Sequence, residues 1–171
     1  MSDVRIPQDA ALGPMINLLC RALNTAHASH LGQLDKSGEA YILHPLRVMR
    51  ALIIDNNGDQ DGGFFSDGFF NLLAVGLLHD VVEDTPMTIE ILSPHFPCDV
   101  VDAIDAISRR DGETYSEYIE RVAANPIATR VKIADIHDNL LPSRALPPTR
   151  RNTERITRYR VALRILEECN E

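Results

Sequence analysis

Residues 69–84 read FFNLLAVGLLHDVVED, and this stretch decides the fold. Residues 69–78 are apolar almost without interruption, which predicts a helix that is apolar nearly all round and therefore lies at the centre of the protein. We expect this helix to run from about Phe69 to Asp84. Its last turn changes abruptly to charged side chains. The stretch therefore predicts a buried central helix that delivers ionisable groups at its carboxyl end.

The rest of the chain shows helical spacing. Apolar residues recur at intervals of three and four between Leu12 and Leu23, and no stretch shows sustained alternation or an internal repeat. Thr114 and Glu117 have the spacing of a capping box, and Asn125-Pro126 predicts an N-cap followed by proline in the first turn. Further helices are expected at about 45–54, 125–141 and 149–168. The sequence predicts an all-α bundle of about seven or eight helices forming a single domain over residues 1–171.

Composition excludes several classes of protein. With 17 Lys and Arg against 25 Asp and Glu, the 171-residue chain has a formal net charge of −8, which disfavours nucleic-acid binding. Its longest apolar run, 72–78, is far shorter than the roughly 20 residues that cross a membrane. The amino terminus lacks the features of a signal peptide, and the three cysteines are widely separated. We expect a cytoplasmic protein with a small-molecule partner; the oligomeric state does not follow.

One segment is not helical in pattern. Residues 56–63, NNGDQDGG, form an acidic loop that imitates part of a calcium-binding loop. The position that should hold a bidentate glutamate is Gly68, however. A solvated loop is the favoured interpretation, and calcium binding is the alternative.

The chemistry is predicted at the end of the central helix. His79 and Glu83 are four residues apart, as are Asp80 and Asp84, so a helix would project all four from one side of its last turn. The carboxylates face the negative end of the helix dipole and follow a buried segment, where ionised groups need compensation. No Lys or Arg lies between Arg50 and Arg109, so no nearby side chain in the sequence offers the compensating positive charge. A bound metal ion would supply that charge. The alternative is a helix end whose acids point into water.

Two further positions offer matching ligands. His44 precedes Pro45 at a helix start, and Asp135 interrupts an otherwise apolar helical stripe. Together with His79 and Asp80 they make a set of two imidazoles and two carboxylates. Such mixed nitrogen and oxygen ligands suit Mn²⁺, Fe²⁺ or Zn²⁺, and the share of carboxylates favours the harder ions.

Three motifs in order carry a family resemblance. Residues 37–45, SGEAYILHP, resemble the pattern S-G-x-P-Y-I-x-H-P, and residues 77–85, LLHDVVEDT, resemble L-L-H-D-x-x-E-D-T. The third motif is Lys132-x-x-Asp135-x-x-x-Asn139. This set is similar to the HD-domain metal-dependent phosphohydrolases, and within them to small alarmone hydrolases and the hydrolase domain of bifunctional alarmone synthetase/hydrolases. The resemblance covers about residues 20–141 and extends to the carboxyl-terminal helix.

The resemblance implies a single HD-domain helical bundle and an activity. The family hydrolyses guanosine tetra- or pentaphosphate, (p)ppGpp, using a metal-activated water that attacks the 3′-pyrophosphate and releases pyrophosphate. Glu83 and Asp84 match the acidic pair that acts on the water and the leaving group. The implied Mn²⁺ ligands are His44, His79, Asp80 and Asp135, and the implied substrate-binding residues are Lys36, Ser37 and Asn139. Arg144 and Arg150 flank Pro147-Pro148 and are expected to contact phosphate.

Some positions depart from the family pattern. Asp35 stands where a base-stacking arginine is expected, Ile136 where an arginine follows the aspartate, and Pro142 where a threonine is usual. These changes spare the metal ligands and affect the nucleotide side. Two alternatives therefore stay open: an HD phosphohydrolase of another nucleotide, such as a nucleoside monophosphate or the 2′-phosphate of NADPH, and a non-catalytic regulatory module.

Overall fold

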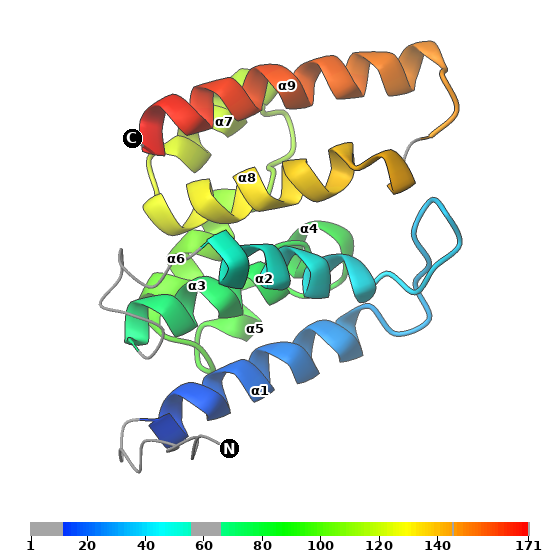
Figure 1. Cartoon of the computed structure of the whole chain (residues 1–171). Coiled ribbons are helices and arrows are strands. Elements are labelled where there is room, and N and C mark those ends of the chain that lie inside the picture. The colour runs from blue at the N-terminus through cyan, green and yellow to red at the C-terminus, as the bar shows by residue number, and fades with distance from the viewer. Residues whose placement is uncertain (1–11, 56–65, 145, 171) are drawn as a thin grey trace, which may run out of the picture.

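The computed structural model describes residues 12–55, 66–144 and 146–170, and within these ranges the fold is all-α (Figure 1). The expected fold class is confirmed. Seven of the helices have nine residues or more, whereas α4 and α5 are single turns of four residues. The helices are α1 (Leu12–Ser29), α2 (Leu43–Asp55), α3 (Asp67–Leu78), α4 (Val81–Asp84), α5 (Ile89–Leu92), α6 (Cys98–Ile107), α7 (Tyr115–Ala123), α8 (Pro126–Leu140) and α9 (Arg150–Asn170), with a 3-10 turn η1 (Pro142–Arg144). The 56–63 loop lies outside the described residues.

Helix α3 is the centre of the bundle. All ten residues from Phe69 to Leu78 are buried, as its apolar sequence predicts. It packs against α1, α2, α6 and α8, and α9 covers the outer side of α8 (Figure 1). A Cβ at Gly76 would lie 2.8 Å from Leu52 Cδ1, so the missing side chain lets α2 pack directly on α3. This close packing brings the start of α2 to the end of α3.

The expectation of one helix from Phe69 to Asp84 is wrong. Helix α3 ends at Leu78, and α4 starts at Val81. Between them Asp80 has φ −100° and ψ −3°, at the edge of the right-handed helical region where it borders the bridge region. The chain turns here because Val81 is fully buried while the Asp80 carboxylate faces the α2 side. His79, Asp80, Glu83 and Asp84 thus do not share one helical turn.

Other boundaries shift little. Helix α2 begins at Leu43, so Pro45 is its third residue rather than its first, which is tolerated because first-turn amides have no helical acceptor. Asn125 caps α8, with proline in the first turn, and Thr114 and Glu117 form the expected capping box on α7. Among the described residues, none of the helices has both the length and the apolar character needed to cross a membrane.

Candidate active site

A polar cavity of about 560 Å³ opens where α2, the α3–α4 junction, α8 and α9 meet. The segment 33–41 and η1 form the rest of its wall. Most of the residues expected to act in chemistry line it: Lys36, Ser37, His44, Asp80, Glu83, Asp84, Asp135, Asn139 and Arg144. His79 lies behind this lining and is 1% exposed. Residues from positions 36 to 144 therefore converge on one site.

His79 is held by the end of α3. Its Nδ1 donates a hydrogen bond to the Gly76 carbonyl at 2.9 Å, so the lone pair of the neutral ring is on Nε2. Nε2 is buried without a hydrogen-bond partner and lies 3.1 Å from Asp80 Oδ2 and 3.9 Å from Asp135 Oδ1. Burial lowers the pKa of His79, but the close contact with Asp80 and the charges of Asp80 and Asp135 together raise it above the ordinary value. The atom thus points into a group of oxygens that cannot donate to it.

His44 enters the same group from α2. Its Nε2 lies 3.1 Å from Asp135 Oδ1 and 3.6 Å from Asp80 Oδ2, while its Nδ1 is 2.7 Å from Asp138 Oδ2. Burial opposes the charged form, but the hydrogen bonds to Asp135 and Asp138 raise the pKa of His44 to about 9. The ring therefore presents Nε2 to the cluster and anchors itself through Nδ1.

Asp135 is the buried carboxylate of the group. Its Oδ2 accepts from Lys132 Nζ at 2.8 Å, and its Oδ1 accepts from Asn139 Nδ2 at 2.6 Å. Burial raises the pKa of a carboxyl, but Lys132 and His44 hold the pKa of Asp135 well below its usual range. Lys132 is in turn buried beside the Tyr118 ring. Asn139, expected to bind substrate, here donates to Asp135.

Asp80 reaches the cluster from the α3–α4 turn. Its Oδ2 accepts from the Tyr41 hydroxyl at 2.6 Å, and the same hydroxyl lies 2.8 Å from Asp84 Oδ2. The hydroxyl has one proton and can donate it to only one of the two carboxylates at a time. Tyr41 therefore connects Asp80 and Asp84 by lying within hydrogen-bond distance of both. Burial and the neighbouring Asp80 charge raise the pKa of Tyr41, which keeps the phenol protonated.

Glu83 and Asp84 lie at the exposed rim of the cavity. Glu83 Oε2 accepts from the Arg109 backbone amide at 3.2 Å. The protein around it displaces water and raises the pKa of Glu83, an effect that the charge of Lys132 opposes. A carboxyl with a raised pKa beside a buried ionic cluster is a candidate for a proton-transfer group.

Three of the expected substrate-binding residues, Lys36, Ser37 and Arg144, line the cavity from the segment 33–41 and from η1. Lys36 is exposed, and partial burial together with the charge of Arg155 lowers its pKa. Ser37 Oγ donates to Asp35 at 2.6 Å, and Arg144 pairs with Asp35 at 3.1 Å. Arg150 is fully in solvent, where it pairs with Glu154 at 2.8 Å, and it does not line this cavity.

Sequence patterns missed several residues of the site. Asp138 contacts His44, and Tyr41 contacts Asp80 and Asp84. Arg155 and Tyr159 of α9 also line the cavity, with the guanidinium 5.6 Å from the ring centroid. Asp138 is three residues after Asp135, so it offered a signal: a second acid on the same part of α8.

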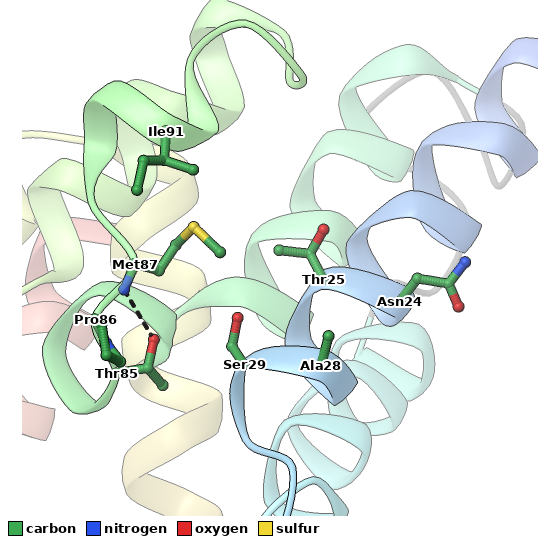
Figure 2. Close-up of a pocket in the computed structure, with 8 residues that line it drawn as sticks. All are labelled: Asn24, Thr25, Ala28, Ser29, Thr85, Pro86, Met87 and Ile91. Atoms are coloured by element: carbon green, nitrogen blue, oxygen red, sulfur yellow. Dashed lines mark hydrogen bonds between the residues drawn. The ribbon is translucent and has the colours of Figure 1, made fainter.

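A second cavity, of about 600 Å³, lies between α1 and the segment 85–91 (Figure 2). Its lining carries hydroxyl, amide and apolar side chains but no ionisable group. The chemistry expected from the sequence is therefore confined, within the described residues, to the polar cavity.

The donor set of the polar cavity fits a divalent metal ion. Ligand atoms of His44, His79 and Asp135 all lie within 4.8 Å of one another. The unpartnered Nε2 of His79 is the decisive atom, because a cation can satisfy its lone pair and the neighbouring carboxylates together. An all-α bundle with a buried imidazole–carboxylate cluster, the His79-Asp80 dipeptide at its centre, defines the class of HD-type metal sites.

Comparison with known proteins agrees with this class. A "Probable GTP pyrophosphokinase" of Mycobacterium leprae is 34% identical over 142 residues, 78% of this chain and 17% of that protein. A "Guanosine-3′,5′-bis(diphosphate) 3′-pyrophosphohydrolase" of Vibrio cholerae is 32% identical over 120 residues, 70% of this chain and 16% of that protein. No family model matches the chain.

A solved structure extends the likeness to the fold. It is described as a metazoan ortholog of SpoT that hydrolyses ppGpp, and it superposes with a TM-score of 0.68 at 25% identity, covering 90% of this chain and 85% of that one. The chain spans only 15–17% of the length of the first three curated relatives. In sequence and in fold, the chain resembles the HD-domain alarmone hydrolases.

Proposed function

We propose that this chain is a metal-dependent hydrolase that removes pyrophosphate from the 3′ position of (p)ppGpp, working as a single HD-type domain in the cytoplasm. The observation that carries the proposal is the buried cluster of two imidazoles and carboxylates with an unpartnered His79 Nε2, at the floor of a cavity whose rim holds two more acids. The relatives named as 3′-pyrophosphohydrolases support the substrate.

The proposed metal is Mn²⁺, held by His44, His79, Asp80 and Asp135. The share of carboxylate oxygens favours a harder ion, and Fe²⁺ or Zn²⁺ would fit the same donors. A bound divalent ion supplies Lewis acidity, which lowers the pKa of water and polarises a phosphoryl oxygen. Asn139 and Lys132 orient Asp135 from α8, and they keep it ionised for this role.

Glu83 is the proposed general base. Its pKa is raised by the surrounding protein, which makes the carboxylate a stronger base for a proton of the attacking water. The Arg109 amide fixes one of its oxygens, which leaves the other free to face the cavity. Asp84, linked to Asp80 through the Tyr41 hydroxyl, is proposed to assist the leaving group.

The cavity also carries cations for an anionic substrate. Lys36, Arg144 and Arg155 line the same cavity as Glu83 and Asp84, and Ser37 follows Lys36 in the chain. Although the chain has a net charge of −8, Lys36 and Arg155 bring positive charge to the cavity for phosphate binding, while Arg144 is paired with Asp35 and Asp138. Lys36, Ser37, Asn139 and Arg144 are the proposed substrate-binding residues.

A panel of nucleotides tests this function. Mn²⁺-loaded protein would be incubated separately with ppGpp, a nucleoside monophosphate and NADPH, and pyrophosphate and orthophosphate would be assayed separately. We expect pyrophosphate from ppGpp and little product from the others. The Asp80→Ala variant is the matched control, because it removes a proposed ligand while keeping the remaining cavity.

The second candidate function is hydrolysis of a phosphate monoester on another nucleotide. It is favoured by Asp35, whose charge is unsuited to stacking on a base and which is already paired with Arg144. Orthophosphate as the main product of the panel would select this candidate over the first.

A further inference from the structure

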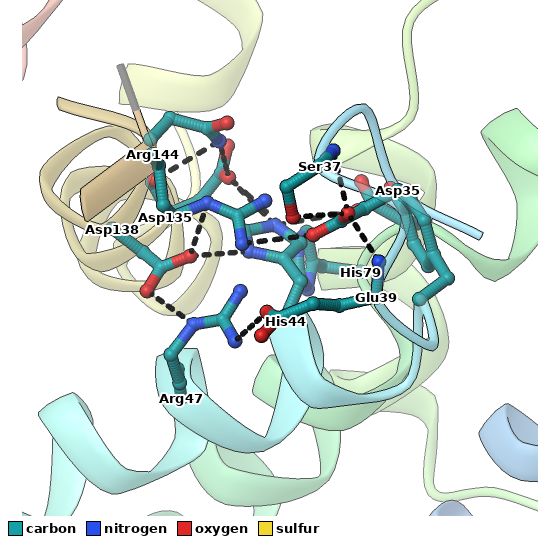
Figure 3. A network of polar contacts seen from close by, with 12 residues as sticks. Asp35, Ser37, Glu39, His44, Arg47, His79, Asp135, Asp138 and Arg144 are labelled. Carbon is teal, nitrogen blue, oxygen red and sulfur yellow. Dashed lines mark hydrogen bonds and ion pairs between the residues drawn. The ribbon is translucent and has the colours of Figure 1, made fainter. Parts of the chain in front are cut away.

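Asp138 is a buried carboxylate that none of the steps above uses. Its side chain is 5% exposed and lies one turn along α8 from Asp135. Oδ2 lies 2.7 Å from His44 Nδ1, and Oδ1 accepts from Arg47 Nε at 2.8 Å (Figure 3). An imidazole that binds a metal through Nε2 must carry its proton on Nδ1, and a carboxylate at Nδ1 fixes that tautomer and the ring orientation.

Arg144 holds the same carboxylate from the other side. Its Nε lies 3.3 Å from Asp138 Oδ2, and its Nη1 donates to Asp35 Oδ2 at 3.1 Å. The guanidinium therefore bridges Asp138 and Asp35, which are 103 positions apart in the chain (138 − 35). Figure 3 shows Arg144 between them, with Arg47 on the far side of Asp138.

Asp35 has two separate tasks. Its Oδ1 accepts from the backbone amides of Ser37 and Glu39 and from the Ser37 hydroxyl, which closes the 35–39 turn. Its Oδ2 is the atom that pairs with Arg144. The acid that stands in place of a base-stacking arginine is thus an anchor for Arg144 rather than a free charge in the cavity.

We propose that Asp138 is a positioning residue that aims His44 Nε2 at the metal position, and that Asp35 acts on the same histidine by holding Arg144 against Asp138. The inference rests on the proposed function only in that His44 serves as a metal ligand. It assigns to Asp35 and Arg144 a role in the metal site. The contacts run from Asp35 in the 35–39 turn through Arg144 and Asp138 to His44 of α2.

Metal affinity tests the role of Asp138. Asparagine at this position keeps the size but cannot accept from both His44 and Arg47, and its amide can donate to Nδ1 and leave the proton on Nε2. We expect Asp138→Asn to weaken Mn²⁺ binding about 10- to 100-fold in calorimetric titration. Asp105→Asn, which breaks the exposed pair with Arg110, is the matched control and should leave the Mn²⁺ Kd within about twofold of the wild type, as expected of a surface change away from the site.

Two readouts separate positioning from a general structural effect. Thermal unfolding should show that Asp138→Asn still folds cooperatively; if it does not, Arg144→Gln, which leaves Asp138 in place, is titrated instead and should weaken Mn²⁺ binding severalfold. In Zn²⁺-loaded protein, the His44 Nδ1 proton should give a protected nuclear magnetic resonance signal in the wild type that is lost in Asp138→Asn. A folded Asp138→Asn variant with wild-type Mn²⁺ affinity would overturn the proposal.

A double-mutant cycle tests the link through Arg144. Asp35→Asn retains an acceptor for the 35–39 turn but places an amide group where Oδ2 faced Arg144. We expect it to weaken Mn²⁺ binding severalfold in the wild-type background and to have no further effect in Arg144→Gln. Equal effects of Asp35→Asn in both backgrounds would contradict the link.

These Mn²⁺-binding experiments test the positioning role separately from the proposed hydrolase activity. If the wild type binds Mn²⁺ and the variants behave as expected but no nucleotide is hydrolysed, the proposed function fails and the positioning role holds. If ppGpp is hydrolysed but Asp138→Asn binds Mn²⁺ as the wild type does, the function holds and the positioning role fails.

Discussion

Lys132 provides the sharpest test of the buried charge cluster. Its Nζ lies 2.8 Å from Asp135 Oδ2, and the two side chains are 12% and 6% exposed. Lys132→Met retains a long apolar stem and removes the ammonium group. Asp135 then stays buried with His44, Asn139 and, at 3.9 Å, His79 as its partners.

Removing one partner of a buried ion pair costs about 3–5 kcal/mol, because the other charge stays uncompensated. Since Asn139, His79 and the protonated His44 remain beside Asp135, we expect the lower end, about 3 kcal/mol less free energy of unfolding at pH 7 without metal. For a chain of this size that corresponds to a fall in Tm of about 6–12 °C. Lys132 depresses the pKa of Asp135, so the loss should shrink in acid, where the variant's Asp135 takes up a proton.

Urea unfolding followed by circular dichroism measures this difference. Lys36→Met is the matched control, because Lys36 is the only other lysine in the sequence and is exposed at the cavity rim. The control should change the free energy of unfolding by no more than about 0.5 kcal/mol. A Lys132→Met variant within about 1 kcal/mol of the wild type would show that the Lys132–Asp135 pair is not needed to keep Asp135 buried, which contradicts this prediction.

Three further predictions concern the same site. The pKa of His44 is raised from 6.5 to about 9, so the protonated ring stabilises the metal-free fold fully below pH 6.5. That contribution, about 3 kcal/mol, should be lost as pH rises through about 9; urea titrations that give a flat profile over this range would speak against it. Glu83→Gln should keep the wild-type Mn²⁺ Kd while turnover falls about 100-fold or more, and a fully active variant would remove Glu83 from the mechanism. Asp80→Ala should lose Mn²⁺ binding and turnover together, measured by calorimetry and product release; tight Mn²⁺ binding without Asp80 would exclude it as a ligand.

The sequence predicts the fold class, and it predicts which residues come together in the candidate site, for physical reasons. The central helix is apolar on all sides, so only the middle of a bundle can hold residues 69–78. His44 lies at a helix start and Asp135 lies in an apolar helical stripe, and at both positions the polar side chain is directed inward. The structure brings both residues to His79.

The parts that sequence patterns did not predict depend on tertiary contacts. The break after Leu78 needs the conformation of Asp80 at the border of the bridge region, which local propensity does not encode. Asp138 looks like any polar residue on an amphipathic helix until Arg47, 91 positions earlier, is placed beside it. Tyr159 has core spacing in α9, and only the packing of α9 on α8 brings it to the cavity wall.

The central claim is the release of pyrophosphate from the 3′ position of ppGpp. The most direct measurement is a phosphorus nuclear magnetic resonance time course of ppGpp with Mn²⁺-loaded wild-type protein, run beside Asp80→Ala. We expect the 3′-diphosphate signals to disappear while inorganic pyrophosphate grows in equal amount and the 5′-diphosphate signals remain, with no change in the variant. Orthophosphate as the first product, or unchanged ppGpp in the presence of Mn²⁺-bound protein, would contradict the claim.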